Sequence, residues 1–149
     1  MKKVGLVLSS SLALTCGVAA PTALGSDASS GAHAVAAGPT VTVQIKTLTK
    51  TLLRPTAVRG HPGWITKGGT PRGKCSASSA AGALDAATHG RWTGKYYASV
   101  PGIFITSILG VKPTGSDYWG IFVNNRASGS GICDIHLHAG ERLLFAIIK

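Results

Sequence analysis

The strongest constraint on the fold lies at the end of the chain, where residues 143–148 read LLFAII. A strand with one face in water alternates apolar and polar side chains, whereas a strand covered on both faces can be apolar throughout. We therefore expect these residues to form a strand in the middle of a sheet. A central strand needs a neighbour on each side, so the rest of the chain has to supply several more strands.

Further strands are indicated just before this run. Residues 118–123 (YWGIFV) are rich in aromatic and β-branched side chains, and Asn124 and Asn125 then give a turn signal. Residues 132–138 alternate apolar and polar side chains, which predicts a third, half-polar strand. A tight turn at residues 139–140 would join it to the final strand.

The region before the helix predicts a hairpin followed by a loop. Residues 41–45 alternate with period two, and residues 51–58 resume an extended pattern in which Pro55 is tolerated only at a sheet edge. Residues 59–74 are crowded with Gly and Pro and predict an irregular loop. Within that loop, the Trp-Ile pair at residues 64–65 is expected to be buried as an anchor.

Residues 76–90 (SASSAAGALDAATHG) predict the single helix. Gly90 stands where a left-handed C-terminal cap is wanted, and the serines at the start can accept hydrogen bonds from the first turn. The candidate N-caps are Ser76, Ser78 and Ser79. The apolar residues at helical spacing are Ala80, Ala83, Leu84 and Ala87. These small side chains would let the helix approach a sheet closely.

The order of elements limits the topology. Residues 91–97 form a short aromatic segment, and residues 103–109 could be a short strand or a turn of helix. Two strands, one helix and three strands (ββαβββ) predict an α+β fold. With a right-handed crossover through the helix, the final strand can lie parallel beside the first. The expected architecture is a β-grasp-like mixed sheet packed on one helix.

The N-terminus has the features of an export signal. Residues 1–25 combine Lys2 and Lys3 with an apolar run and a small-residue end, which predicts a signal peptide. Polar residues dilute the run, so a membrane anchor is the weaker alternative, and no transmembrane segment is expected in the mature chain. Lipidation at Cys16 stays open. Residues 26–39 are expected to be a flexible leader, the domain to span residues 40–149, and the protein to be extracellular or in the cell envelope.

Export would leave two cysteines, Cys75 and Cys133. An even pair in an oxidising compartment favours a disulfide over a metal site. We therefore expect these two residues to be bonded.

The basic charge is large but dispersed. Fifteen Lys and Arg residues, less Lys2 and Lys3 of the signal, leave thirteen against five acidic residues, a formal charge of +8. The basic residues occur singly or in pairs, and aromatic residues do not interleave with them as a stacking platform requires. We expect no specific nucleic-acid partner, while attraction to anionic wall polymers stays possible.

Chemistry-bearing residues give no catalytic pattern. Asp134, His136 and His138 alternate along one predicted strand, which could present two imidazoles to a metal, but zinc usually needs three or four ligands. The two serines within residues 127–131 lack the strand-to-helix setting of a nucleophile elbow. We expect no enzyme activity, no metal site and no cofactor.

Aromatic residues are the candidate ligand-binding residues. They are Trp64, Trp92, Tyr96, Tyr118 and Trp119. Aromatic side chains dominate both binding pockets and the cores of small domains, so either role fits.

Several of these segments together resemble the transcobalamin-like C-terminal domain family. They are YWGIFVNN at residues 118–125, GIC at 131–133, GERLLF at 140–145, the helix start CSASSAAGAL at 75–84 and the opening hairpin at 41–58. Glu141 stands where the family typically has Asp. The resemblance implies a β-grasp module, which in vitamin B12 carriers closes over cobalamin together with a helical domain, and it implies no settled activity.

The sequence therefore predicts an exported, non-catalytic β-grasp module that binds a small ligand or a cell-envelope partner. The alternative is a structural or adhesive surface module that contacts anionic wall polymers. Ligand identity, the signal cleavage site and the oligomeric state are left open.

Overall fold

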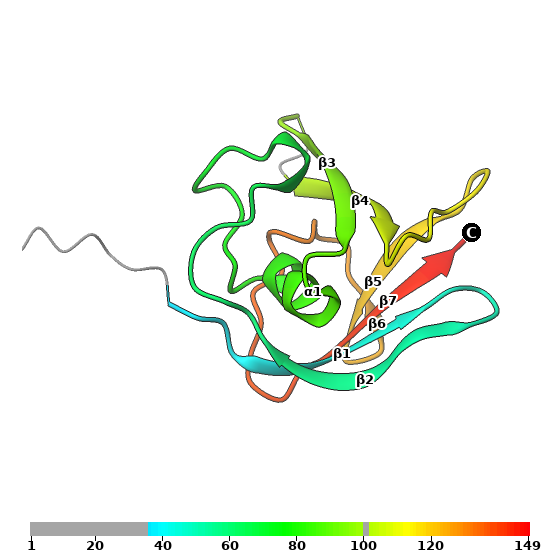
Figure 1. Cartoon of the computed structure of the whole chain (residues 1–149), viewed down its shortest axis with the longest axis horizontal. Helices are drawn as coiled ribbons and strands as arrows, with labels where there is room; N and C mark the ends of the chain where they lie inside the picture. The colour runs from blue at the N-terminus through cyan, green and yellow to red at the C-terminus, as the bar shows by residue number, and fades with distance from the viewer. Residues whose placement is uncertain (1–35, 100–101) are drawn as a thin grey trace, which may run out of the picture. The chain divides into compact units, whose positions relative to one another are not determined.

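The computed structural model describes residues 36–99 and 102–149, and these form a mixed α+β domain (Figure 1). The elements in order are β1 (Thr40–Lys46), β2 (Thr51–Arg59), the 3-10 turn η1 (Lys67–Gly69), α1 (Ala80–Thr88), β3 (Trp92–Tyr97), β4 (Gly102–Ile108), β5 (Tyr118–Val123), β6 (Arg126–Ala127) and β7 (Arg142–Ile148). None of the helices in the described part of the chain is long and apolar enough to span a membrane. The predicted signal peptide lies outside the described residues.

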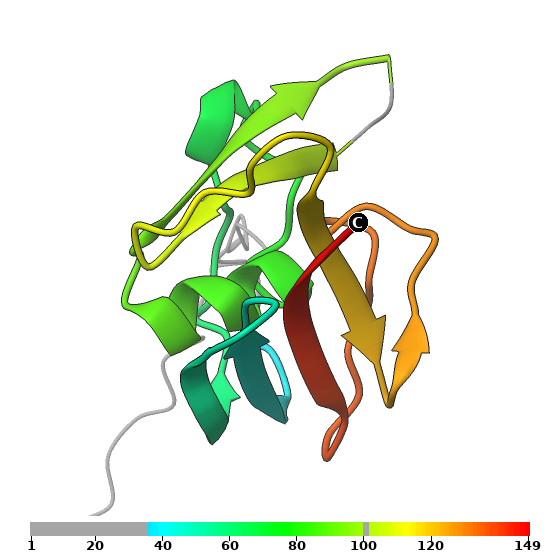
Figure 2. The same ribbon diagram turned by 90° about the vertical axis from the view of Figure 1, so that its right-hand side faces the viewer.

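The main sheet has the strand order β2-β1-β7-β5-β6. The final strand β7 runs parallel to β1 and antiparallel to β5, so it occupies the centre of the sheet as its apolar sequence predicts (Figure 2). The hairpin of β1 and β2 is confirmed, and Pro55 lies on the edge strand. Edge strands are where a sheet tolerates proline, which lacks the backbone N–H donor.

One face of this sheet packs on α1 and forms the core. Val43, Ile45, Leu143 and Phe145 from β1 and β7 are fully or almost fully buried there. The alternate residues of β7 are only half-buried. The expectation that both faces of this strand are covered is thus met on the helix side alone.

Helix α1 is shorter than the predicted 76–90 because Ser79 is extended and acts as the N-cap. Its hydroxyl accepts from the backbone N–H of Ala81 at 3.3 Å. The predicted apolar stripe is buried, and the helix ends at His89 in the left-handed region, followed by Gly90 at φ +75°. The buried carbonyl of Ala77 approaches the helix so closely that a Cβ on Gly82 would stand 1.7 Å from its oxygen.

The prediction of a strand at residues 132–138 is wrong. The segment forms a turn and one isolated bridge, between His136 and Ser79. Its carbonyls are used elsewhere: Ile132 accepts from the N–H of Ala81, and Ile135 accepts from that of Ala80. These are amides of the first helical turn, which lack partners within the helix. The backbone therefore caps α1 instead of joining a ladder.

After the helix, the described residues form five strands, where three were predicted. Residues 91–97 and 103–109 largely coincide with β3 and β4, which pair with each other in a separate two-stranded sheet. The second segment is therefore a strand and not a helical turn. The short β6 follows a turn in which Asn124 and Asn125 have φ of +49° and +67°. Two residues with positive φ are typical of the tightest hairpin turns.

The predicted disulfide between Cys75 and Cys133 is present, with the Cα atoms 4.8 Å apart and a sequence separation of 58 residues. Both residues are buried. The bond fastens the segment that leads into α1 to the segment that caps it. The loop before it is anchored by the buried Ile65, whose N–H donates to the Cys75 carbonyl at 2.9 Å.

Candidate ligand-binding surface

The sheet face opposite α1 carries apolar side chains that no other element buries. We call it the outer face. Strand alternation and register place on it Thr42 and Gln44 of β1, Arg142, Leu144, Ala146 and Ile148 of β7, and Tyr118, Gly120 and Phe122 of β5. Leu144, Ala146, Ile148 and Phe122 are half-buried and Tyr118 is 42% exposed. An apolar stripe on a central strand that faces outward marks a surface suited to binding.

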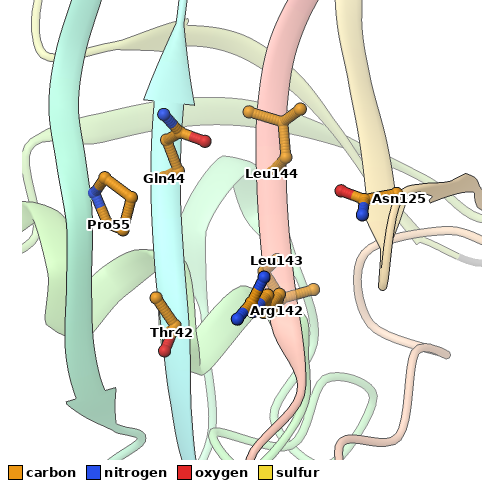
Figure 3. Close-up of a pocket in the computed structure, with 7 residues that line it drawn as sticks. All are labelled: Thr42, Gln44, Pro55, Asn125, Arg142, Leu143 and Leu144. Carbon is orange, nitrogen blue, oxygen red and sulfur yellow. The ribbon is translucent and has the colours of Figure 1, made fainter.

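A shallow pocket of about 320 Å³ lies on this face (Figure 3). Gln44 and Leu144 are register partners on β1 and β7 and stand side by side in it, with Pro55 of β2 and Asn125 on either side. Thr42 and Arg142 form its other end. The pocket combines an apolar floor with amide, hydroxyl and guanidinium groups, which is the composition typical of small-molecule sites.

A hydrogen-bond network at the start of β7 positions this polar end. Asn124 accepts from the Arg142 backbone N–H at 3.0 Å and donates to Glu141 Oε1 at 3.2 Å. Glu141 Oε2 accepts from the His138 backbone N–H at 2.8 Å. The turn before β6 and the turn before β7 are thereby tied together, which fixes Asn125 and Arg142 relative to each other. Glu141 therefore has a structural role in the turn.

Arg142 supplies the positive charge of the pocket. It is exposed, and the salt bridges found among residues 36–99 and 102–149 all involve Asp85, on the far side of the sheet from this pocket. The guanidinium therefore has no carboxylate partner among the described residues. It can bind a carboxylate or phosphate of a ligand through two parallel hydrogen bonds.

The aromatic residues proposed from the sequence are not gathered in one site. Trp92 is 2% exposed, and its indole N–H donates to Asp85 Oδ1 at 2.7 Å. Trp119 is 5% exposed, and Tyr96 and Trp64 are half-buried. Of the five, Tyr118 alone lies on the outer face. The residues that line the pocket were missed because their neighbourhood depends on strand register, although the period-two set Thr42 and Gln44 was a usable signal.

Asp85 forms a second polar cluster, beneath the loop at residues 59–74. Its carboxylate lies 3.5 Å from Lys67 Nζ and 3.6 Å from His61 Nε2, besides accepting from Trp92. Lys67 also donates to the Gly90 carbonyl at 2.8 Å and lies 5.4 Å from the Trp92 ring centre. These contacts hold the loop against the helix and β3, which is a structural task.

Asp134, His136 and His138, which the sequence offered as conceivable metal ligands, are all exposed. Within the described ranges no group of three His, Cys, Asp or Glu side chains is placed to hold a metal ion. Zinc sites in proteins usually use three or four such ligands. The geometry of these residues therefore gives no support to a metal centre.

Together these features define a disulfide-bonded α+β module with one open sheet face. Residues 77–149 match the family model described as a domain of unknown function, DUF4430. No curated protein sequence matches the chain.

Two solved structures have a similar fold. Haptocorrin in complex with Cbi has a TM-score of 0.53 and 16% identity, over 77% of this chain and 26% of that one. A "putative metal binding protein" from Ruminococcus gnavus ATCC 29149 has a TM-score of 0.51 and 11% identity, over 74% of this chain and 97% of that one. The chain spans about a quarter of the haptocorrin chain, and at these identities the likeness concerns the fold.

Proposed function

We propose that the chain is an exported, non-catalytic β-grasp module that binds a small ligand on the outer face of its sheet. The observation that carries this proposal is the pocket of about 320 Å³ between β1 and β7, with its apolar floor and a guanidinium that has no carboxylate partner among the described residues. A sheet wrapped over one helix with parallel first and last strands fits the β-grasp description. The disulfide fits an oxidising compartment, and so supports export.

The lining residues indicate the chemistry of the ligand. Leu144 and Pro55 offer apolar contact, Gln44 and Asn125 offer amide donors and acceptors, and Arg142 attracts negative charge. A ligand with a flat apolar body, several amide or carbonyl groups and one acidic group matches this set. The fold shared with haptocorrin, which was solved with Cbi, makes corrinoids reasonable members of a first screen.

The test is a thermal-shift screen with Cbi, cobalamin, haemin and flavin mononucleotide. A ligand present at about 100 times its dissociation constant stabilises the folded state by about 2.7 kcal/mol, which is a clearly measurable rise in melting temperature. Arg142→Gln should weaken binding of an acidic hit about tenfold or more, because a charge-assisted hydrogen bond contributes about 1.5–3 kcal/mol. Arg72→Gln, the same change at an exposed loop residue, is the matched control.

The charge favours a second candidate, an adhesive module for anionic wall polymers. The predicted mature chain has a formal charge of +8, and most Lys and Arg side chains are exposed. Attachment of this kind falls steeply with salt and weakens about equally in Arg142→Gln and Arg72→Gln. Equal losses in the two variants, with no response to any compound of the screen, would replace the ligand proposal by this one.

A further inference from the structure

A second pocket, of about 210 Å³, lies between β4, β5 and the loop that follows β6. Its apolar lining comes from Ile103, Ile105 and Ile132, and its rim holds the rings of Phe104 and Tyr118, which are 53% and 42% exposed. Ser128 and Ser130 add hydroxyls, and none of the lining residues is charged. The size suits one small group, below the usual range for drug-sized ligands, and the lack of charge suits a neutral one.

Trp119 lines this pocket and has an unsatisfied donor. The residue is 5% exposed, and its indole Nε1 is buried with no hydrogen-bond partner among the described residues. A buried N–H without an acceptor costs free energy, so such groups are rare and call for a partner. The atom has almost no solvent-accessible area, so a ligand oxygen would satisfy it once the indole turns toward the pocket.

The backbone of Trp119 adds a second donor and an acceptor. The Asn124 N–H donates to the Arg142 carbonyl at the start of β7. The backbone N–H and C=O groups of every second residue back along β5 therefore also face β7. Those of Trp119 and Ile121 face the opposite edge of β5. There the Ile121 carbonyl accepts from Ser128, but β6 pairs only with Phe122 and Val123. The N–H and C=O of Trp119 thus face the pocket without a strand beside them.

We propose that this pocket binds an N-acetylated amino sugar. Its acetamido carbonyl accepts from the indole N–H of Trp119, its amide N–H donates to the edge carbonyl of Trp119, and its methyl group lies against the isoleucines. The sugar ring stacks on Phe104 and Tyr118, since aromatic rings cover the apolar face of a sugar well. Within the described residues, Trp119 is the one residue of this edge without a backbone partner, which is too short for an added peptide strand and suits a single amide.

The test is an NMR titration of the ¹⁵N-labelled chain with triacetylchitotriose. Cellotriose, which lacks acetamido groups, and an acetylated trialanine amide are the comparison probes. The Trp119 indole resonance should move and saturate with triacetylchitotriose only. Phe104→Ala should weaken this binding at least tenfold with little change in melting temperature, whereas Leu48→Ala, another exposed apolar side chain at 57%, should leave it unchanged.

Four results would overturn the proposal. They are no shift of the indole resonance at millimolar triacetylchitotriose, an equal response to cellotriose, a response to the peptide alone, and an unchanged titration in Phe104→Ala. If the indole N–H bonds only to an internal water, no probe will shift its resonance, and this is the first of the four results. The pocket between β1 and β7 shares no lining residue with this one, so either proposal can fail alone.

Discussion

Removal of the disulfide between Cys75 and Cys133 should cost a large part of the stability of this domain. The bond closes a loop with 58 residues of sequence separation. On the chain-entropy model, a loop of this length stabilises the folded state by about 4 kcal/mol, because the crosslink restricts the unfolded chain. The whole free energy of unfolding of a small domain is about 5–15 kcal/mol. The melting temperature should therefore fall by roughly 15 °C.

The assay is thermal unfolding followed by circular dichroism, with the double variant Cys75→Ala/Cys133→Ala compared with the unmodified chain. Reduction of the unmodified chain is the control, since it breaks the crosslink without changing side-chain volume. It should reproduce most of the decrease and have no effect on the double variant. A double variant that melts within about 3 °C of the parent would refute the reasoning, because the crosslink would then not restrict the unfolded chain as the model requires.

Two further predictions concern the helix and its surroundings. Gly82→Ala gains helix propensity of about 1 kcal/mol, but its Cβ would stand 1.7 Å from the Ala77 carbonyl oxygen, so we expect a net loss of about 2 kcal/mol in urea unfolding. Gly129→Ala, where nothing lies within 4 Å, should change little, and a stabilised Gly82→Ala would contradict the packing described. Asp85→Asn keeps an acceptor for the Trp92 N–H but loses the charge that faces Lys67 and His61. It should lower the free energy of unfolding by about 1 kcal/mol. Asp85→Ala also leaves the Trp92 N–H without an acceptor, which should cost about 1–3 kcal/mol more of unfolding free energy. Equal stability of these two variants would argue against the network.

The parts of the fold that sequence predicted are those specified by local pattern. The central position of residues 143–148 followed from an unbroken apolar run, and α1 from its caps and its alanine stripe. The pairing of Cys75 with Cys133 followed from there being one pair left after export. The export signal itself stays a prediction.

The failures have a common physical cause, which is the choice of partner for the backbone. Residues 132–138 have the alternation of a strand, and Cys133 and Ile135 are indeed buried while Asp134 is exposed. The carbonyls of Ile132 and Ile135, however, cap the helix. Periodicity reports which side chains are buried and says nothing about where the hydrogen bonds go.

The candidate site could not be predicted from the sequence, for a related reason. Gln44 and Leu144 lie 100 positions apart in sequence and become neighbours through the parallel register of β1 and β7. The aromatic residues favoured by composition went mainly to the core, as Trp92 and Trp119 show. Composition could indicate a binding module, but the face of the sheet that carries the pocket became known only from the strand order and register.

The central claim is that the outer face of the sheet binds the ligand. It is tested most directly by amide chemical-shift mapping with whichever compound of the screen raises the melting temperature. The largest shifts should fall on Gln44, Asn125 and Leu144, and Arg142→Gln should abolish or weaken them while Arg72→Gln does not. Shifts confined to residues 59–74 or to α1, with the outer face unperturbed, would contradict the account.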